Sequence, residues 1–174
     1  SVAFKKILKD VDVGNIKSVQ DLATLPVLRK SELVRLQAES PPLGGLISRS
    51  VEDLNQIFQS PGPIYEPGMV KRDWWRSARA LNAAGIGRGD IVQNCFSYHF
   101  TPAGMLSEQG ILAVGATVFP AGTGQTELQA RAASEIGVTA YIGVPDFLQI
   151  ILDKGDELGL DLSKLTKALV GGGP

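Results

Sequence analysis

The chain has 174 residues, a length that suits one globular domain and leaves little for a second. Hydrophobic residues make up 44% and charged residues 20%, a balance that argues against an intrinsically disordered chain. The 17 lysines and arginines face 18 acidic residues, so the net charge of −1 lacks the basic excess of a non-specific nucleic-acid-binding protein. The single Cys95 cannot form an internal disulfide, and no apolar stretch of about 18 residues or leader sequence occurs. We therefore expect a cytoplasmic protein that binds neither nucleic acid nor membrane.

The ends of the chain suggest that it is part of something longer. It begins at Ser1 without a methionine and stops on the turn-forming string 171–174, Gly-Gly-Gly-Pro. The chain has 20 glycines and 10 prolines in all, which indicates many tight turns between regular elements. We expect these residues to be a portion of a larger protein.

The first part of the chain predicts short helices. Apolar residues within 4–11 recur at helical spacing, and Ser31 is a suitable N-cap for a second helix. The Ser-Pro-Pro-Leu-Gly-Gly stretch at 40–45 then breaks regular structure. This break predicts a helical segment over 1–45 and an α/β subdomain over 46–174.

A short strand and an irregular loop are predicted next. Ile57–Gln59 is apolar, whereas Ser60–Gly68 contains three prolines, which lack the N–H that regular structure uses. Loops of this kind can cradle an anion on backbone N–H groups, especially before a helix N-terminus. The prolines and the negative Glu66 oppose that role. A structural turn and a ligand contact both stay open.

The segment Asp73–Ala84 predicts a helix that Gly85 would terminate. Arg72, Arg76 and Arg79 recur at i, i+4 and i+7, so they would share one face of this helix. That face would be solvated, or would contact a phosphorylated cofactor or a partner chain.

From residue 91 strands and helices alternate. Strand starts at residues 91, 116, 139 and 168 lie near the spacing of the βαβ unit, which has roughly 30 residues. This alternation predicts an α/β fold, with a mostly parallel sheet and flanking helices. The expected elements are strands at Ile91–Phe96, Ala116–Phe119, Thr139–Gly143 and Ala168–Val170, and helices at Pro102–Val114, Thr126–Ile136 and Pro145–Leu158.

Ligands of such sheets bind at the carboxyl ends of the strands. The loops expected there are Ser60–Gly68, Ser97–Thr101, Pro120–Gln125, Val144–Asp146 and Gly171–Pro174.

Two residues with reactive side chains stand close together at the end of the strand that starts at Ile91. His99 is the only histidine, and it is either a loop residue satisfied by backbone or a pocket residue that exchanges protons or hydrogen-bonds an acyl group. Cys95 lies in an apolar strand, where cysteine is normally a small buried hydrophobe. One histidine and one cysteine do not supply a metal site, so none is expected. The hydrolase motif Gly-x-Ser-x-Gly is absent from the sequence.

Three spaced stretches match, in order, the motifs of one enzyme family. The first is 22–26, Leu-Ala-Thr-Leu-Pro, with Lys-Ser-Glu-Leu at 30–33. The second is 118–127, Val-Phe-Pro-Ala-Gly-Thr-Gly-Gln-Thr-Glu, and the third is 141–148, Tyr-Ile-Gly-Val-Pro-Asp-Phe-Leu. Over nearly its whole length the chain resembles the phenylacetate-CoA ligase family of the adenylate-forming (acyl-AMP synthetase, AMP-binding) superfamily, as an N-terminal portion.

The resemblance implies an ATP-dependent ligase. In such enzymes a small aryl or acyl carboxylic acid attacks the α-phosphate of ATP, which gives an acyl-adenylate and pyrophosphate. Coenzyme A then displaces AMP and forms a thioester. ATP with Mg²⁺, coenzyme A and the acid are the implied cofactors and substrates, and the oligomeric state is left open, a homodimer included.

The resemblance also implies a nucleotide loop at Ser60–Pro67, where the family has Ser-Ser-Gly-Thr-Thr-Gly-Lys-Pro. Ser60, Gly62 and Pro67 match this motif, whereas Glu66 replaces the lysine. Ser60 and Gly62 are therefore implied cofactor-binding residues of a loop that should hold a triphosphate less well than its relatives do.

An acyl pocket and an adenine-side turn are implied further along the chain. The aromatic segment Phe96, Tyr98, His99 and Phe100 corresponds to the residues that line the acyl pocket in relatives. The implied turn that packs on adenine comprises Gly171, Gly172 and Gly173.

The family's catalytic lysine and ribose-binding aspartate would fall beyond residue 174. No catalytic residue is therefore expected within this chain, which alone should not adenylate an acid. The altered nucleotide loop keeps an alternative open, a divergent non-catalytic member that binds an acyl ligand or a partner.

Overall fold

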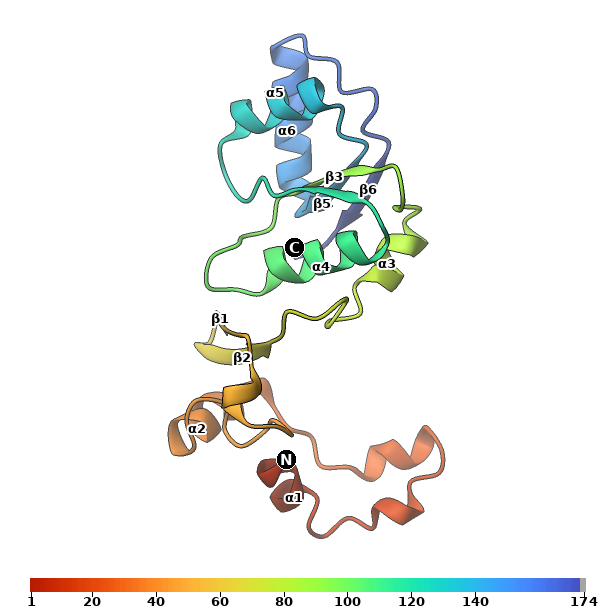
Figure 1. Ribbon diagram of the computed structural model, residues 1–174. Coiled ribbons are helices and arrows are strands. Elements are labelled where there is room, and N and C mark those ends of the chain that lie inside the picture. Colours follow the sequence, from red (N-terminus) through yellow and green to blue (C-terminus); the bar gives the residue numbers. More distant parts are fainter. Residues whose placement is uncertain (173–174) are drawn as a thin grey trace. The chain divides into compact units, whose positions relative to one another are not determined.

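The computed structural model describes residues 1–172, and the chain forms two compact units, Ser1–Met69 and Val70–Pro174 (Figure 1). The hairpin at 56–68 thus groups with the N-terminal helices, beyond the break predicted at residues 40–45. The predicted domain boundary at residue 45 stays a prediction, because a compact unit is not by itself an independently folding domain.

The first unit contains short helices and one hairpin. Its α-helices are α1 (Val2–Ile7) and α2 (Lys30–Glu39), and short 3₁₀ helices occur at Val13–Asn15, Gln20–Thr24 and Val51–Asp53. The Ser1 side chain caps α1 by accepting a hydrogen bond from the Phe4 N–H at 3.2 Å. The prediction that Ser31 caps the second helix was wrong. α2 begins at Lys30, with Arg29 in extended conformation as its N-cap, so Ser31 lies inside the first turn.

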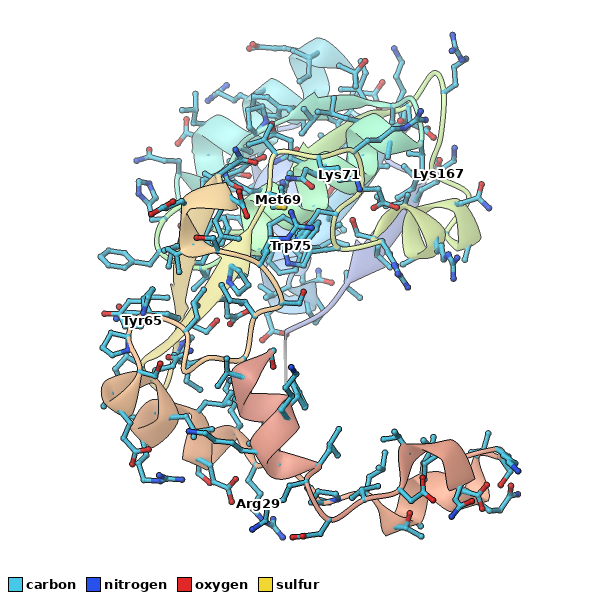
Figure 2. All side chains as sticks on the ribbon, turned by 60° about the horizontal axis from the view of Figure 1, so that its bottom comes forward. Arg29, Tyr65, Met69, Lys71, Trp75 and Lys167 are labelled. Atoms are coloured by element: carbon cyan, nitrogen blue, oxygen red, sulfur yellow. The ribbon has the colours of Figure 1, made fainter. Side chains whose placement is uncertain are left out.

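The hairpin pairs β1 (Gln56–Ser60) with β2 (Ile64–Gly68) in antiparallel register. The amide of the buried Gln37 ties α2 to this hairpin: its Nε2 donates to Tyr65 O at 2.7 Å, and its Oε1 accepts from the Tyr65 N–H at 2.9 Å. Tyr65 is labelled beside α2 in Figure 2.

The prediction that Ser60–Gly68 has no regular structure was wrong. Only residues 61–63 form the turn, and Pro67 lies within β2 opposite Ile57. A two-stranded ribbon consists of edge strands alone, and an edge strand tolerates a residue without an N–H. The loop is followed by a strand rather than a helix N-terminus, and the hairpin is separate from the parallel sheet.

The second unit contains the predicted α/β fold. Four parallel strands lie in the order β4-β3-β5-β6, and Figure 1 shows α3 and α4 on one side of the sheet and α5 and α6 on the other. The strands are β3 (Ile91–Asn94), β4 (Thr117–Phe119), β5 (Ala140–Gly143) and β6 (Lys167–Val170), and the helices are α3 (Ala78–Ala83), α4 (Ala103–Ala113), α5 (Thr126–Ile136) and α6 (Pro145–Glu157). The predicted fold class is confirmed.

Strand alternation produces two cores, one on each face of the sheet. Within β5, Ala140 and Ile142 pack with Leu81 and Ile111 of α3 and α4. Tyr141, between them, points to the opposite face and packs with residues of α5 and α6. Burial of both faces explains why β5 is apolar throughout instead of alternating with polar residues.

The helix predicted over Asp73–Ala84 is shorter in the structure, where α3 begins at Ala78. Asp73 and Arg76 have φ angles of 49° and 61°, in the left-handed region, which interrupts a helix before it starts. The Asp73 carboxylate instead accepts a hydrogen bond from the Ala78 N–H at 3.0 Å. The predicted arginine face is therefore wrong, since Arg79 alone of the three arginines lies in the helix. The termination at Gly85 is confirmed by its φ of 73°.

An ion pair fastens the amino-terminal edge of the sheet. The carboxylate of Asp90, before β3, lies 2.9 Å from the Lys167 Nζ of β6 at both oxygens, and accepts hydrogen bonds from Thr139 Oγ1 and the Gly87 N–H, each at 2.8 Å. Burial alone would raise the pKa of Asp90, but these donors outweigh it and lower that pKa. Lys167 is labelled in Figure 2.

Candidate active site

Four loops meet at the carboxyl edge of the parallel sheet. They follow β3, β4, β5 and β6, as predicted for Ser97–Thr101, Pro120–Gln125, Val144–Asp146 and the described start of 171–174. The fifth predicted loop, Ser60–Gly68, belongs to the hairpin of the first unit instead.

The end of β6 lies against the aromatic loop that follows β3. A Cβ placed on Gly172 would lie 3.7 Å from Val144 Cγ1 and 3.9 Å from Phe96 Cε1, which is van der Waals contact. Gly171 donates its N–H to Gly143 O at 3.1 Å. The structure thus brings Gly171, Gly172 and Phe96 to one edge, whereas Gly173 lies outside the described residues.

The aromatic loop presents its residues at different depths. Phe96 and Tyr98 are half-buried, whereas His99 and Phe100 are exposed, with Phe100 at 77% exposure. Burial raises the pKa of Tyr98, and a hydrogen bond with Glu108 raises it further. The backbone of His99 is fixed by hydrogen bonds with Ser97 and Thr101. The substrate role of these four residues stays a prediction.

Gly104, at the start of α4, allows this loop to close. Its N–H donates to Ser97 O at 2.9 Å, and a Cβ at this position would lie only 2.6 Å from that same oxygen. A larger residue would therefore push the helix away from the loop.

Asn94, at the end of β3, hydrogen-bonds to the aromatic loop, to the start of α4 and to the loop after β4. Its Nδ2 donates to Tyr98 Oη and to Gly104 O, each at 2.8 Å, and its Oδ1 accepts from the Phe96 N–H at 3.2 Å. The Asn94 backbone oxygen accepts from the Gly122 N–H at 2.9 Å. The side chain is fully buried, so these bonds are made without competition from water.

Gln129 of α5 performs a similar task for the loop after β4. Its Nε2 donates to Gly122 O at 2.9 Å and to Gly124 O at 2.7 Å, while its Oε1 accepts from Gln93 Nε2 at 2.7 Å and from Cys95 Sγ at 3.0 Å. Sequence reasoning missed Asn94, Gln93 and Gln129. The available signal was an amide pair in an otherwise apolar strand and a glutamine on the inward face of a helix.

Cys95 is buried, as predicted. Burial raises the pKa of its thiol to about 12, so the thiol is protonated and serves as a donor to Gln129 rather than as a nucleophile. Within residues 1–172 no three histidine, cysteine, aspartate or glutamate side chains gather to hold a metal ion.

The implied nucleotide loop has a different chemistry from a phosphate clamp. Ser60 Oγ donates a hydrogen bond to the Glu66 carboxylate across the hairpin, so the hydroxyl already has an acceptor. Gly62 lies exposed in the turn between Pro61 and Pro63. The donor set at this loop does not fit a triphosphate, because a carboxylate stands where a cation would be needed.

Most of the chain is similar in sequence to known CoA ligases. The chain is 27% identical over 160 residues to the phenylacetate-coenzyme A ligase of Aromatoleum evansii and 25% identical over 172 residues to that of Thermus thermophilus, which covers 88% and 94% of the chain. The resemblance to phenylacetate-CoA ligases is confirmed. The chain spans about a third of the length of these curated relatives, 35% and 38% respectively. No protein-family model matches the chain.

Solved structures of a CoA ligase share the fold of this chain. An open conformation of 2-hydroxyisobutyryl-CoA ligase, in complex with 2-HIB-AMP and CoA, superposes with a TM-score of 0.80 over 92% of the chain and 37% of that enzyme, at 20% identity. The same enzyme in the postadenylation state, with R3-HIB-AMP, gives a TM-score of 0.81. No helix among residues 1–172 combines the length and the hydropathy that crossing a membrane requires.

Proposed function

We propose that the natural protein containing this chain is an ATP-dependent acyl- or aryl-CoA ligase. The observation that carries this proposal is the sequence similarity to phenylacetate-CoA ligases over 84% to 94% of the chain. The meeting of the aromatic loop and the glycine segment at one sheet edge supports it, since ligands of open α/β sheets bind at that edge. A cytoplasmic location and a homodimer stay predictions.

The proposed reaction has two displacements. A carboxylate oxygen of the acid forms a bond to the α-phosphorus of ATP, and the bond from that phosphorus to the bridging oxygen breaks and releases pyrophosphate. The sulfur of coenzyme A then bonds to the acyl carbon, and the bond from this carbon to the AMP oxygen breaks. The residues of this chain would bind and orient the acid and the adenine, and supply no group that takes part in either bond change.

The acid is proposed to lie against Phe96 and Tyr98, with His99 and Phe100 at the entrance. Tyr98 presents a neutral phenol, as tyrosine does at neutral pH, and burial raises its pKa further. A neutral, aromatic wall favours an aryl or other apolar group, with differences of about 1 to 3 kcal/mol for each methylene. Gly171 and Gly172 are proposed to present backbone to the adenine ring, and a role of Gly173 in cofactor binding stays a prediction.

An exchange assay tests the proposal. The natural protein at its full length is incubated with ATP, labelled pyrophosphate and a panel of aryl acids that includes phenylacetate. Incorporation of label into ATP in the presence of any one acid is expected. No exchange with any acid, together with an ATP dissociation constant of about 1 mM or weaker, would contradict a ligase.

A second candidate function has its own observation. The hydrogen bond from Ser60 to Glu66 removes a hydroxyl donor and adds a carboxylate at the implied nucleotide loop. A divergent protein that has lost nucleotide binding and retains only an acyl-ligand or partner site would keep such a loop. Exchange activity in the assay above would exclude this alternative.

The charge at position 66 can be tested separately. Glu66→Lys should tighten ATP binding about fivefold to thirtyfold, because exchanging one unit charge for its opposite near an exposed phosphate is worth about 1 to 2 kcal/mol. Isothermal titration at low salt measures the effect, with Glu52→Lys in the same unit as the matched change of net charge. Equal effects of both substitutions would show that the loop does not contact the nucleotide.

A further inference from the structure

The carboxyl edge contains two buried side-chain amides, those of Asn94 and Gln129. Asn94 hydrogen-bonds to the aromatic loop and the first turn of α4, and Gln129 to the loop after β4 and to Gln93 and Cys95. Asn94 and Gln129 are 0% and 3% exposed, and Gln93, which bonds to Gln129, is 1% exposed. The clusters that bury the two faces of the sheet consist otherwise of apolar residues and Cys95. The position of the amides calls for an explanation other than core packing.

The orientation of the Gln129 amide follows from its partners. Gln93 Nε2 and the Cys95 thiol both donate, so the oxygen of Gln129 faces them and its two N–H groups face outward. These N–H groups bind the oxygens of Gly122 and Gly124. Both glycines have left-handed φ angles, 69° and 74°, and a Cβ at either would meet nothing within 4 Å. The loop after β4, residues 120–125, is called the glycine loop below. Its two glycines are therefore held by hydrogen bonds to Gln129 rather than by side-chain packing.

Asn94 provides the corresponding support on the other loop. Its Nδ2 binds the phenol of Tyr98 and the first turn of α4, and its backbone oxygen binds the Gly122 N–H. Gly122 thus receives a hydrogen bond from Gln129 at its oxygen and gives one to Asn94 from its nitrogen. Gly122 therefore connects the Gln129 side chain to the main chain of Asn94, whose own side chain holds the aromatic loop, so the two loops are held at a fixed separation.

Stability alone does not require this arrangement. Replacing hydrogen-bonded partners together by apolar groups of the same shape is often nearly neutral for a fold. A network of neutral amides fixes loops without adding a charge, whereas the ion pair at the opposite edge uses charges for the same purpose. Neutral supports suit an edge where anionic substrates would bind.

We propose that Asn94 and Gln129 are positioning residues that hold the aromatic loop and the glycine loop at the separation the acid requires. The part of this inference that concerns the acid rests on the proposed function, whereas the holding of the loops does not. Displacement of a substrate-positioning loop by about 1 Å can cost roughly a hundredfold in rate. The amides act through Tyr98 and the loop backbone and do not touch the reacting atoms.

The test uses the natural protein at full length with Gln129→Met, which keeps the length of the side chain and removes its hydrogen bonds. Gln129→Asn is the second variant, in case the first does not fold, because its amide is one methylene too short to reach the loop. Thr139→Val is the matched control. It removes the hydroxyl hydrogen bonds to Asp90 and Ile91 at the amino-terminal edge, far along the strand from both loops.

Two readouts are taken on each variant. Hydrogen–deuterium exchange followed by mass spectrometry reports the peptides over 95–104 and 120–126, where exchange should become at least tenfold faster in the Gln129 variants and unchanged in the control. Steady-state kinetics with phenylacetate, ATP and coenzyme A should show the Michaelis constant for phenylacetate raised about tenfold or more. The Michaelis constant for ATP should change less than threefold.

The outcomes separate the two proposals. Unchanged exchange in both peptides, or an equal change in the Thr139→Val control, would overturn the positioning role whether or not the enzyme is active. If the unsubstituted protein shows no ligase activity, the proposed function is overturned. Faster hydrogen–deuterium exchange in both peptides of the Gln129 variants would then still support the holding of the loops. Equal increases in both Michaelis constants would overturn the assignment of the loops to the acid.

Discussion

The two edges of the parallel sheet are held by different chemistry. At the amino-terminal edge, Asp90 and Lys167 form an ion pair, and the donors around Asp90 lower its pKa, so it is ionised. At the carboxyl edge, the supporting side chains Asn94, Gln93 and Gln129 are neutral amides, and burial raises the pKa of the Cys95 thiol to about 12. The amino-terminal edge is thus joined by a pair of opposite charges, whereas the buried side chains that support the loops of the carboxyl edge are neutral amides and a protonated thiol.

The largest effect should come from breaking the ion pair. Lys167→Met leaves the carboxylate of Asp90 buried without its cation, which should lower the free energy of unfolding by about 2 to 3 kcal/mol. This is below the 3 to 5 kcal/mol or so typical of a fully buried pair, because the Lys167 side chain is 36% exposed. Urea denaturation followed by circular dichroism measures the change.

Lys154→Met is the control for that substitution. Lys154 pairs with Glu157 on the surface of α6, and its loss should cost less than about 0.5 kcal/mol. A similar loss for both variants would mean that the ion pair at the amino-terminal edge contributes no more than a surface pair.

At the carboxyl edge, Gly104→Ala should lower the free energy of unfolding by about 2 kcal/mol. Alanine normally stabilises a helical position relative to glycine by about 1 kcal/mol, but here its Cβ would lie 2.6 Å from Ser97 O. The backbone of the aromatic loop must therefore shift. Thermal unfolding compares this variant with Gly159→Ala, where a Cβ would meet nothing within 4 Å and only the left-handed φ of 63° opposes alanine. A gain in stability for Gly104→Ala would show that the loop is not closely packed on α4.

The pH dependence of stability should distinguish the two edges by a smaller amount. Because the pKa of Asp90 is lowered in the folded state, its contribution is present above the unfolded pKa, near 4, and is lost as the pH falls through the folded value. Asp90→Asn should therefore flatten the acid side of the stability profile by up to about 1.4 kcal/mol for each pH unit. Urea titrations between pH 5 and pH 3 measure the slope. An unchanged slope would mean that Asp90 is not coupled to Lys167 in solution.

The sequence predicted the regular part of this fold well because its signals are local. Residues 126–136 show helical periodicity with Gly137 after them, and the predicted helix coincides with α5. The first strand of the hairpin was predicted at Ile57–Gln59, which lies within β1, but the second strand was missed because its prolines indicate a loop, although an edge strand accepts them. The start of α3 was missed because nothing in the sequence signals the left-handed φ of Arg76.

The candidate site was predictable only in its location. Strand order and alternation place four loops at one edge, and the structure confirms this placement. The supports beneath the loops depend on hydrogen bonds between residues far apart in sequence, such as Gln93 and Gln129, which are 36 positions apart. The amide pair in an apolar strand was a local signal that these residues are unusual, but only the folded structure shows which partners they bind.

The smallest effect on the fold, and the most direct test of neutrality at the carboxyl edge, concerns the reactivity of Cys95. Burial raises the pKa of this thiol to about 12, and only the thiolate reacts with iodoacetamide. At pH 8 the folded chain should alkylate at Cys95 less than about a hundredth as fast as the chain unfolded in urea, as measured by mass spectrometry of the peptide that carries this residue. Gln129→Met removes the acceptor of the thiol without exposing it, so the rate should stay low. A folded-state rate within tenfold of the unfolded rate would show that water reaches this edge, and the contrast between a charged and a neutral edge would then be lost.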